Sequence, residues 1–197
     1  IHYQGSTITY GELLAESQRV AAGLAARGVG EGDRVAVWLP NMPAWLALMF
    51  ACARLGAIVV SVNTRFRAHE VADIVSRSGC RMLVLWPDFK AIDFAGILAA
   101  IEPAALAGIE HVVVYDEGGQ AAQRELIAGV AHSRYADLNA SAQEATVLGG
   151  AEHRCVIFTT SGTTKAPKFV GHVQGTVARH AQDVAAALGM NRAGAKV

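Results

Sequence analysis

Short apolar segments without polar alternation recur along this chain of 197 residues, and segments with helical periodicity separate them. Strands of this kind are covered on both faces, whereas a half-exposed strand alternates polar and apolar residues. Helices of about ten or more residues between such strands favour parallel pairing and right-handed crossovers. We therefore expect an α/β fold, with a doubly wound, mostly parallel sheet and helices on both faces. The expected strands are 34–39, 57–62, 82–86, 111–115, 155–159 and a short one at 169–173.

The start of the first helix is the clearest local signal for a helix. Thr9, with Glu12 three residues later, forms a capping-box pattern. We expect this helix to end near Gly28. Asn41 is expected to cap the second helix, with Pro43 in its first turn. This second helix is expected to continue to Leu55. The other expected helices are 68–78, 89–101, 123–131 and 175–188.

Composition and charge limit the class of protein. Hydrophobic residues make up 52% of the chain and charged residues 17%, which is typical of a packed globular domain rather than a disordered one. The formal net charge is zero, so we expect no nucleic-acid partner. The longest apolar run, 44–53, is shorter than the roughly 20 residues that cross a bilayer, so no membrane span is expected. The three cysteines are Cys52, Cys80 and Cys155, and none has the spacing to a histidine that is typical of a metal site. We therefore expect them to be buried free thiols in a reducing cytoplasm.

Residues 160–168, T-S-G-T-T-K-A-P-K, combine hydroxyl groups, a glycine and two lysines directly after an apolar strand. Backbone N–H groups and hydroxyls donate hydrogen bonds to phosphate oxygens, Gly162 permits close approach, and a lysine supplies positive charge. The order differs from the P-loop pattern G-x-x-x-x-G-K-[ST], because here the lysines follow the hydroxyls. Ligands in open parallel sheets bind beyond the carboxyl ends of the strands. We therefore expect a phosphate-binding loop at that edge rather than a surface linker.

The sequence F-T-T-S-G-T-T-K-A-P-K-F-V resembles the phosphate-loop signature T-S-G-T-T-G-x-P-K-G of the adenylate-forming superfamily. That family includes acyl- and aryl-CoA synthetases, peptide-synthetase adenylation domains and luciferases. T-Y-G-E-L at 9–13 and R-L-G-A-I-V-V-S-V-N-T-R at 54–65 resemble two further blocks of the family, and the ending V-N-T-R is closer to acyl-CoA synthetases. The chain departs from the signature at Lys165 and Phe169, where glycine is usual, and both replace a residue that tolerates positive φ.

This resemblance implies an acid–thiol ligase that forms AMP. A carboxylic acid would attack the α-phosphate of ATP, with Mg²⁺ present, and the resulting acyl-adenylate would pass its acyl group to coenzyme A. Lys168 would be the catalytic contact to the phosphates. The residues expected to bind the phosphates are Thr160, Ser161, Gly162, Thr163, Thr164, Lys165 and Lys168.

The length of family members carries a further expectation about domain organisation. Residues 1–197 are expected to form an N-terminal α/β subdomain with its phosphate loop at 160–168, while the later subdomains and the C-terminal domain lie outside the chain. Without them, we expect the chain alone to be inactive and to bind ATP weakly at best. We also expect the loop to be mobile without nucleotide.

Two other functions stay open at this point. The departures at Lys165 and Phe169 are compatible with a non-catalytic nucleotide- or phosphate-binding module of the same fold. A different phosphotransfer enzyme, such as a kinase, would need a metal-binding carboxylate near the sheet edge, and the sequence offers no clear candidate.

Several side chains also have two interpretations. His172 follows the loop closely enough to line a nucleotide cleft, but we favour a surface or packing role. Arg65 and Arg67 are interpreted as solvated cations rather than a site for a phosphate of coenzyme A. Core positions are favoured over base stacking for the tryptophans, which are Trp38, Trp45 and Trp86.

Overall fold

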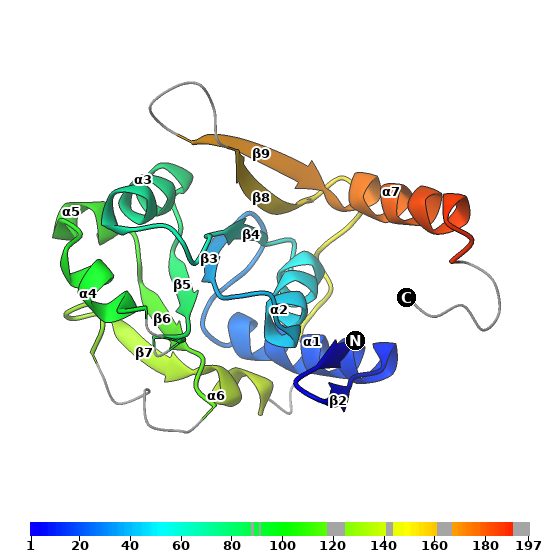
Figure 1. The fold of residues 1–197 in the computed structure, drawn as a ribbon, viewed down its shortest axis with the longest axis horizontal. Coiled ribbons are helices and arrows are strands. Elements are labelled where there is room, and N and C mark those ends of the chain that lie inside the picture. The colour runs from blue at the N-terminus through cyan, green and yellow to red at the C-terminus, as the bar shows by residue number, and fades with distance from the viewer. Residues whose placement is uncertain (88, 91, 118–124, 141–143, 161–166, 191–197) are drawn as a thin grey trace.

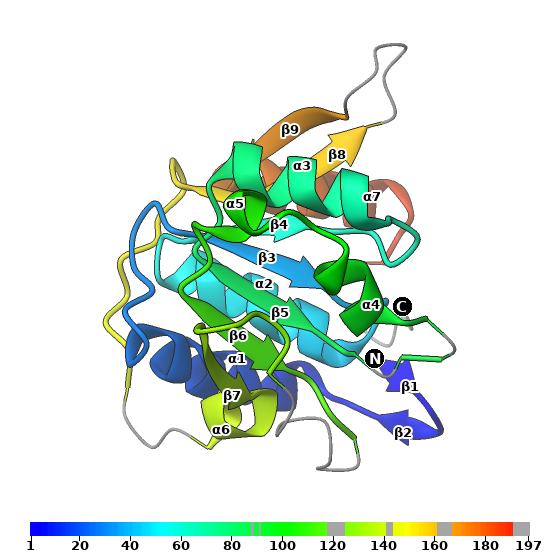
Figure 2. The same ribbon diagram turned by 90° about the vertical axis from the view of Figure 1, so that its left-hand side faces the viewer.

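The computed structural model describes residues 1–87, 89–90, 92–117, 125–140, 144–160 and 167–190. It confirms the expected α/β fold, in which a seven-stranded sheet of order β7-β6-β5-β3-β4-β8-β9 lies between two layers of helices (Figures 1 and 2). β3 to β8 pair in parallel, and β9 is antiparallel to β8. The strands are β3 (Arg34–Trp38), β4 (Ile58–Ser61), β5 (Met82–Leu85), β6 (His111–Val114), β7 (Ala131–Arg134), β8 (Arg154–Thr160) and β9 (Lys168–Val173).

The helices divide between the two faces of the sheet (Figure 2). One face is covered by α1 (Tyr10–Ala25), α2 (Pro43–Arg54) and α6 (Tyr135–Asn139). The other is covered by α3 (Ala68–Ser78), α4 (Phe94–Ala99) and α5 (Pro103–Leu106). A small hairpin of β1 (His2–Tyr3) and β2 (Ser6–Thr7) precedes α1, and α7 (Gln174–Ala187) follows β9. None of the helices in the described residues is long and apolar enough to cross a membrane.

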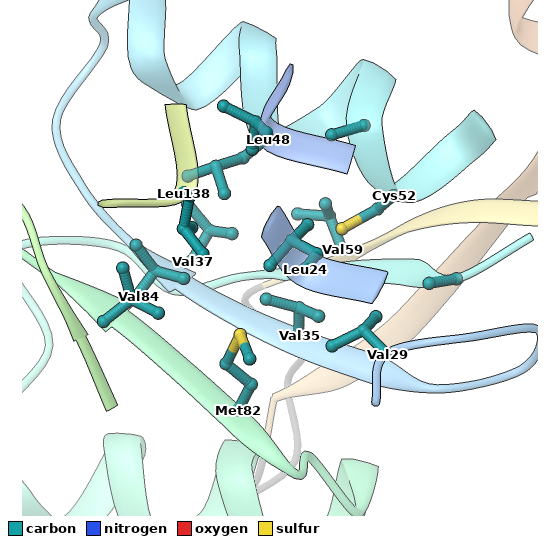
Figure 3. Packing of buried hydrophobic residues seen from close by; sticks show 14 of the residues in the cluster. Leu24, Val29, Val35, Val37, Leu48, Cys52, Val59, Met82, Val84 and Leu138 are labelled. Atoms are coloured by element: carbon teal, nitrogen blue, oxygen red, sulfur yellow. The ribbon is translucent and has the colours of Figure 1, made fainter. Parts of the chain in front are cut away.

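Adjacent residues of the central strand β3 pack into different hydrophobic clusters. Val35 and Val37 belong to the cluster under α1 and α2, and Figure 3 shows them in the same cluster as Leu24 of α1. Ala36 and Trp38 belong to the cluster on the opposite face. All four strand residues are fully buried. A strand that is buried on both sides has no exposed face, which explains why the sequence shows no polar alternation.

The capping prediction holds for α1 and fails for α2. Thr9 accepts a hydrogen bond from the backbone N–H of Glu12 at 3.2 Å, and the Glu12 carboxylate accepts the Thr9 N–H at 2.8 Å. This bonding lowers the pKa of Glu12. At α2 the cap position belongs to Met42, which makes no side-chain capping bond, although Pro43 begins the helix as expected. The prediction that Asn41 caps this helix is therefore wrong.

The helix expected at 89–101 is wrong over its first part. α4 begins only at Phe94, after Asp93, whose carboxylate accepts the N–H of Gly96 at 2.8 Å. An aspartate bonded in this way marks the N-terminus of a helix. Before it, Lys90 has a φ of 56°, which lies in the left-handed region and is incompatible with a right-handed helix.

The helix expected at 123–131 is also wrong. Residues 125–130 form turns, and 131–134 form β7, which pairs with β6 at the edge of the sheet. The first two residues of the expected helix lie outside the described residues. An edge strand needs no continuous apolar run, so β7 was missed, as was the short helix α6 after it. β8 is consequently the sixth parallel strand of the sheet rather than the fifth.

The cysteines provide a test of burial. All three are free and buried, as expected. Burial raises the pKa of Cys52 to about 12 and that of Cys80 to about 11. Because the thiolate is the reactive form, we expect neither to react with an aromatic disulfide reagent at about pH 8 in the native chain, and both to react after denaturation. Rapid labelling of either residue under native conditions would contradict this expectation.

Gly23 of α1 packs directly against the backbone of α6. A Cβ atom at this position would lie 2.5 Å from the Cα and 2.6 Å from the carbonyl oxygen of Leu138. Overpacking of this kind typically costs about 1–3 kcal/mol, so Gly23→Ala should lower the free energy of unfolding in urea by that amount. Gly11 of the same helix is the matched control, because its Cβ would meet nothing closer than the Thr9 hydroxyl at 3.9 Å. Gly11→Ala should instead raise stability by roughly 0.5–1 kcal/mol.

Candidate functional site

The predicted phosphate loop leaves the sheet at the end of β8 and returns at the start of β9. Thr160 and Lys168 are directly opposite each other in the antiparallel ladder, so their side chains share one face of the ribbon. The rest of the loop, 161–166, lies outside the described residues, as does the expectation about its mobility. The predicted site residues concerned are Ser161, Gly162, Thr163, Thr164 and Lys165.

The end of β8 lies at the carboxyl edge of the parallel sheet, as expected for this loop. β8 is parallel to β4, with Val60 opposite Ile157, and it continues beyond this pair to Thr160. The chain leaves β3 through α2 on one face, whereas it leaves β4 and β5 through α3 and α4 on the other (Figure 2). Connections that depart on opposite faces open a crevice at the carboxyl edge, which is where such sheets bind ligands.

A cavity of about 590 Å³ opens at this edge. Its volume is within the range of small-molecule sites, which runs from roughly 300 to 1,000 Å³. The segments that follow β3, β4 and β5 form most of its wall, and the end of β8 completes it. The lining residues are 39–41, Trp45, 61–65, Phe89, Lys90, Phe158 and Thr159.

The described residues that line this cavity favour an anionic ligand. They include the cations Arg65 and Lys90 and no Asp or Glu. Neutral hydrogen-bonding groups surround the cations, in side chains such as those of Asn41 and Asn63. A cleft that is lined by one sign of charge concentrates ligands of the opposite sign.

The loop after β4 is held in shape by hydrogen bonds around Asn63. The Asn63 side-chain oxygen accepts the backbone N–H of Arg65 at 2.9 Å. The backbone carbonyl oxygen of Asn63 accepts a hydrogen bond from the indole N–H of Trp38 at 3.1 Å. Since Trp38 is fully buried, this bond ties the cavity wall to the core.

The structure distinguishes between the two arginines of the V-N-T-R region. Arg67 donates from Nη1 to the carbonyls of Arg65 and Phe66, so its exposed guanidinium braces its own loop. Arg65 is also exposed, but it lines the cavity. Both arginines are exposed, as the interpretation as solvated cations predicted, and Arg65 in addition lines the cavity.

The histidine and the tryptophans considered from the sequence are packed to different extents. His172 is half-buried, and its ring meets that of Phe158 edge-on with centroids 5.8 Å apart, as the packing interpretation predicted. Trp38 is a core residue, whereas Trp45 and Trp86 are half-buried. Trp45 also lines the cavity.

Lys90 is a site residue that sequence reasoning missed. It was placed inside an expected helix, whereas it lies at the carboxyl edge with a left-handed φ of 56°. Such a conformation is uncommon for a residue other than glycine and often accompanies functional sites. Its place shortly after a buried strand was the available signal, because that position lies at the ligand-binding edge.

The described residues provide no protein ligand set for a metal. No three His, Cys, Asp or Glu side chains in this part of the chain are grouped so that they could hold an ion. These residues therefore do not fit a dedicated Mg²⁺ site.

A family model now identifies the chain. The model for AMP-binding enzymes matches residues 1–195. The chain belongs to the AMP-binding enzyme family. The resemblance inferred from the phosphate-loop signature is thereby confirmed.

Several relatives of this chain are named as CoA ligases. The chain is 33% identical over 171 residues to the long-chain-fatty-acid–CoA ligase FadD13 of Mycobacterium tuberculosis, covering 86% of this chain and 30% of FadD13. It is 35% identical over 103 residues to the mitochondrial medium-chain acyl-CoA ligase ACSF2 of Bos taurus, covering 52% of this chain and 17% of that protein.

Solved structures agree with these relatives. The anthranilate CoA ligase AuaEII, in complex with anthranoyl-AMP, superposes with a TM-score of 0.75 at 25% identity, covering 91% of this chain and 32% of that one. The o-succinylbenzoate CoA synthetase MenE of Bacillus subtilis gives a TM-score of 0.68 at 26% identity, covering 95% and 33%. This AMP-binding chain thus spans about a third or less of the length of these four proteins.

Proposed function

We propose that the protein containing this chain is an AMP-forming acid–thiol ligase. It would activate a carboxylic acid with ATP and then transfer the acyl group to coenzyme A. The observation that carries the proposal is the cation-lined cavity at the carboxyl edge, beside which β8 ends at Thr160 with Lys168 opposite. Family membership and the names of the CoA-ligase relatives support it.

The first step sets the physical requirement for the loop. A carboxylate oxygen of the acid forms a bond to the α-phosphorus of ATP while the bond from that phosphorus to the bridging oxygen breaks, and pyrophosphate leaves. Negative charge grows on the departing pyrophosphate, so fixed donors and cations around the β- and γ-phosphates stabilise the transition state. We assign this role to the hydroxyls and backbone of 160–164 and to Lys168, with Lys165 as an additional cation.

The remaining substrates follow from the relatives. Names that specify ligation of long-chain fatty acids, of medium-chain acyl groups and of anthranilate to CoA support a carboxylic acid as substrate and CoA as acceptor, without fixing the size of the acid. Mg²⁺ would enter on the phosphate oxygens of ATP. The three buried free cysteines support a reducing compartment, for which we propose the cytoplasm.

Removing the charge of Lys168 tests the proposed step. In the full-length protein, Lys168→Ala should slow ATP–pyrophosphate exchange by about 10²–10³, the scale for one transition-state contact. Arg154 is the matched control, because it is an exposed cation at the opposite end of β8. Arg154→Ala should keep the full rate. Unchanged exchange in Lys168→Ala would remove this lysine from the mechanism.

The chain of 197 residues should not catalyse the reaction alone. We expect no ATP–pyrophosphate exchange from it, because it spans only about a third of the relatives. Turnover by the isolated chain would contradict this expectation. A full-length protein that binds ATP but never exchanges pyrophosphate would instead support the alternative, a non-catalytic nucleotide-binding module.

A further inference from the structure

The start of β9 is fastened to helix α3 by one arginine. Arg77, in the last turn of α3, donates a hydrogen bond from Nη2 to the carbonyl oxygen of Pro167 at 2.7 Å. Its guanidinium carbon also lies over the ring of Phe169, 4.4 Å from the centroid. These two contacts hold the residues immediately before and after Lys168.

Asp73, one turn earlier on α3, fixes the orientation of this arginine. Its two carboxylate oxygens accept hydrogen bonds from Nε and Nη2 of Arg77, each at 2.7 Å. The hydrogen bond with Asp73 raises the pKa of Arg77, a group that is charged at all ordinary pH values. A planar guanidinium can bind a carboxylate along one edge while its flat face lies on an aromatic ring, which a lysine ammonium cannot reproduce.

The contact with Phe169 determines the direction in which Lys168 points. Phe169 packs against the hydrophobic cluster on the face covered by α3. Successive side chains of a strand alternate between faces, so Lys168 lies on the opposite face. Thr160 and Phe158 share that opposite face through the ladder, and the ends of both faces of β8, at Phe158 and Thr159, line the cavity. A slip of one residue in β9 would turn Lys168 away from this side.

We propose that Arg77, held by Asp73, is a positioning residue that sets the strand face and register of Lys168 through Pro167 and Phe169. This inference rests on the proposed function of Lys168. Phe169 stands where the resembled family signature has glycine. A glycine would offer Arg77 no ring, so the arginine and the phenylalanine act as a pair.

The test uses ATP–pyrophosphate exchange by the full-length enzyme. Arg77→Ala should lower kcat by about 10- to 100-fold, the scale for a misplaced catalytic group, and leave KM for the acid unchanged. Arg77→Lys keeps the charge but not the fork or the flat face, so it should restore little of the rate. The double variant Arg77→Ala/Lys168→Ala should be no slower than Lys168→Ala, because Arg77 acts only through the lysine.

Hydrogen exchange gives a second measurement that does not depend on activity. The backbone amides of β9 should exchange faster in Arg77→Ala. Arg134 is the matched control, since it forms a comparable exposed ion pair with Asp137 at 2.8 Å beside the opposite edge of the sheet. Arg134→Ala should change neither the rate of ATP–pyrophosphate exchange nor the hydrogen exchange of the β9 amides.

The outcomes separate the two proposals. If Lys168→Ala is slow but Arg77→Ala is fully active, or if the double variant loses a further factor equal to that of Arg77→Ala, the positioning role is overturned. If Lys168→Ala is itself fully active, the proposed role of the lysine fails. Hydrogen exchange of the β9 amides alone then decides whether Arg77 anchors β9. Unchanged hydrogen exchange of the β9 amides in Arg77→Ala would then overturn the proposal that Arg77 anchors β9.

Discussion

The β8–β9 ribbon is joined to the rest of the sheet by a short parallel ladder between β4 and β8, and the geometry of the candidate site depends on it. The paired residues are Val59 with Val156 and Val60 with Ile157. Val156 packs into the cluster under α1 and α2, while Ile157 packs against the cluster on the other face. Apolar burial from both sides therefore fixes the direction of β8, and that direction delivers Thr160 to the carboxyl edge.

Much of this fold was predictable because its signals are local. The helix expected at 68–78 is α3 to the residue, and the buried strands differ from expectation by one residue at one or both ends. Prediction failed where tertiary position decides local structure. β7 can be polar because it lies at an edge, and nothing in its four residues, A-H-S-R, indicates a strand without β6 beside it.

In the candidate site, too, the residues that follow from local signals were predictable and those that depend on tertiary contacts were not. The end of β8 was placed correctly because a motif after a parallel strand must lie at the carboxyl edge. Arg65 and Lys90 were accessible to the same rule, since each follows a buried strand, but one was interpreted as solvated and the other as helical. The bond from Arg77 to Pro167 was beyond sequence reasoning. It joins residues 90 positions apart, and it exists only because α3 covers the face of the sheet against which Phe169 packs.

The substitution at Phe169 has a physical rationale in this arrangement. Donors that stabilise a departing phosphate are effective when they are in place before charge develops, because no reorganisation is then required during the reaction. A glycine at the start of β9 would leave the backbone more conformations and give no side chain to hold. An aromatic ring removes that freedom and presents a face to the guanidinium that Asp73 orients. The same ring, half-buried on the α3 side, commits its neighbour Lys168 to the opposite face of the strand. In this chain, packing supplies the placement of the cation, and the loop does not need to supply it alone.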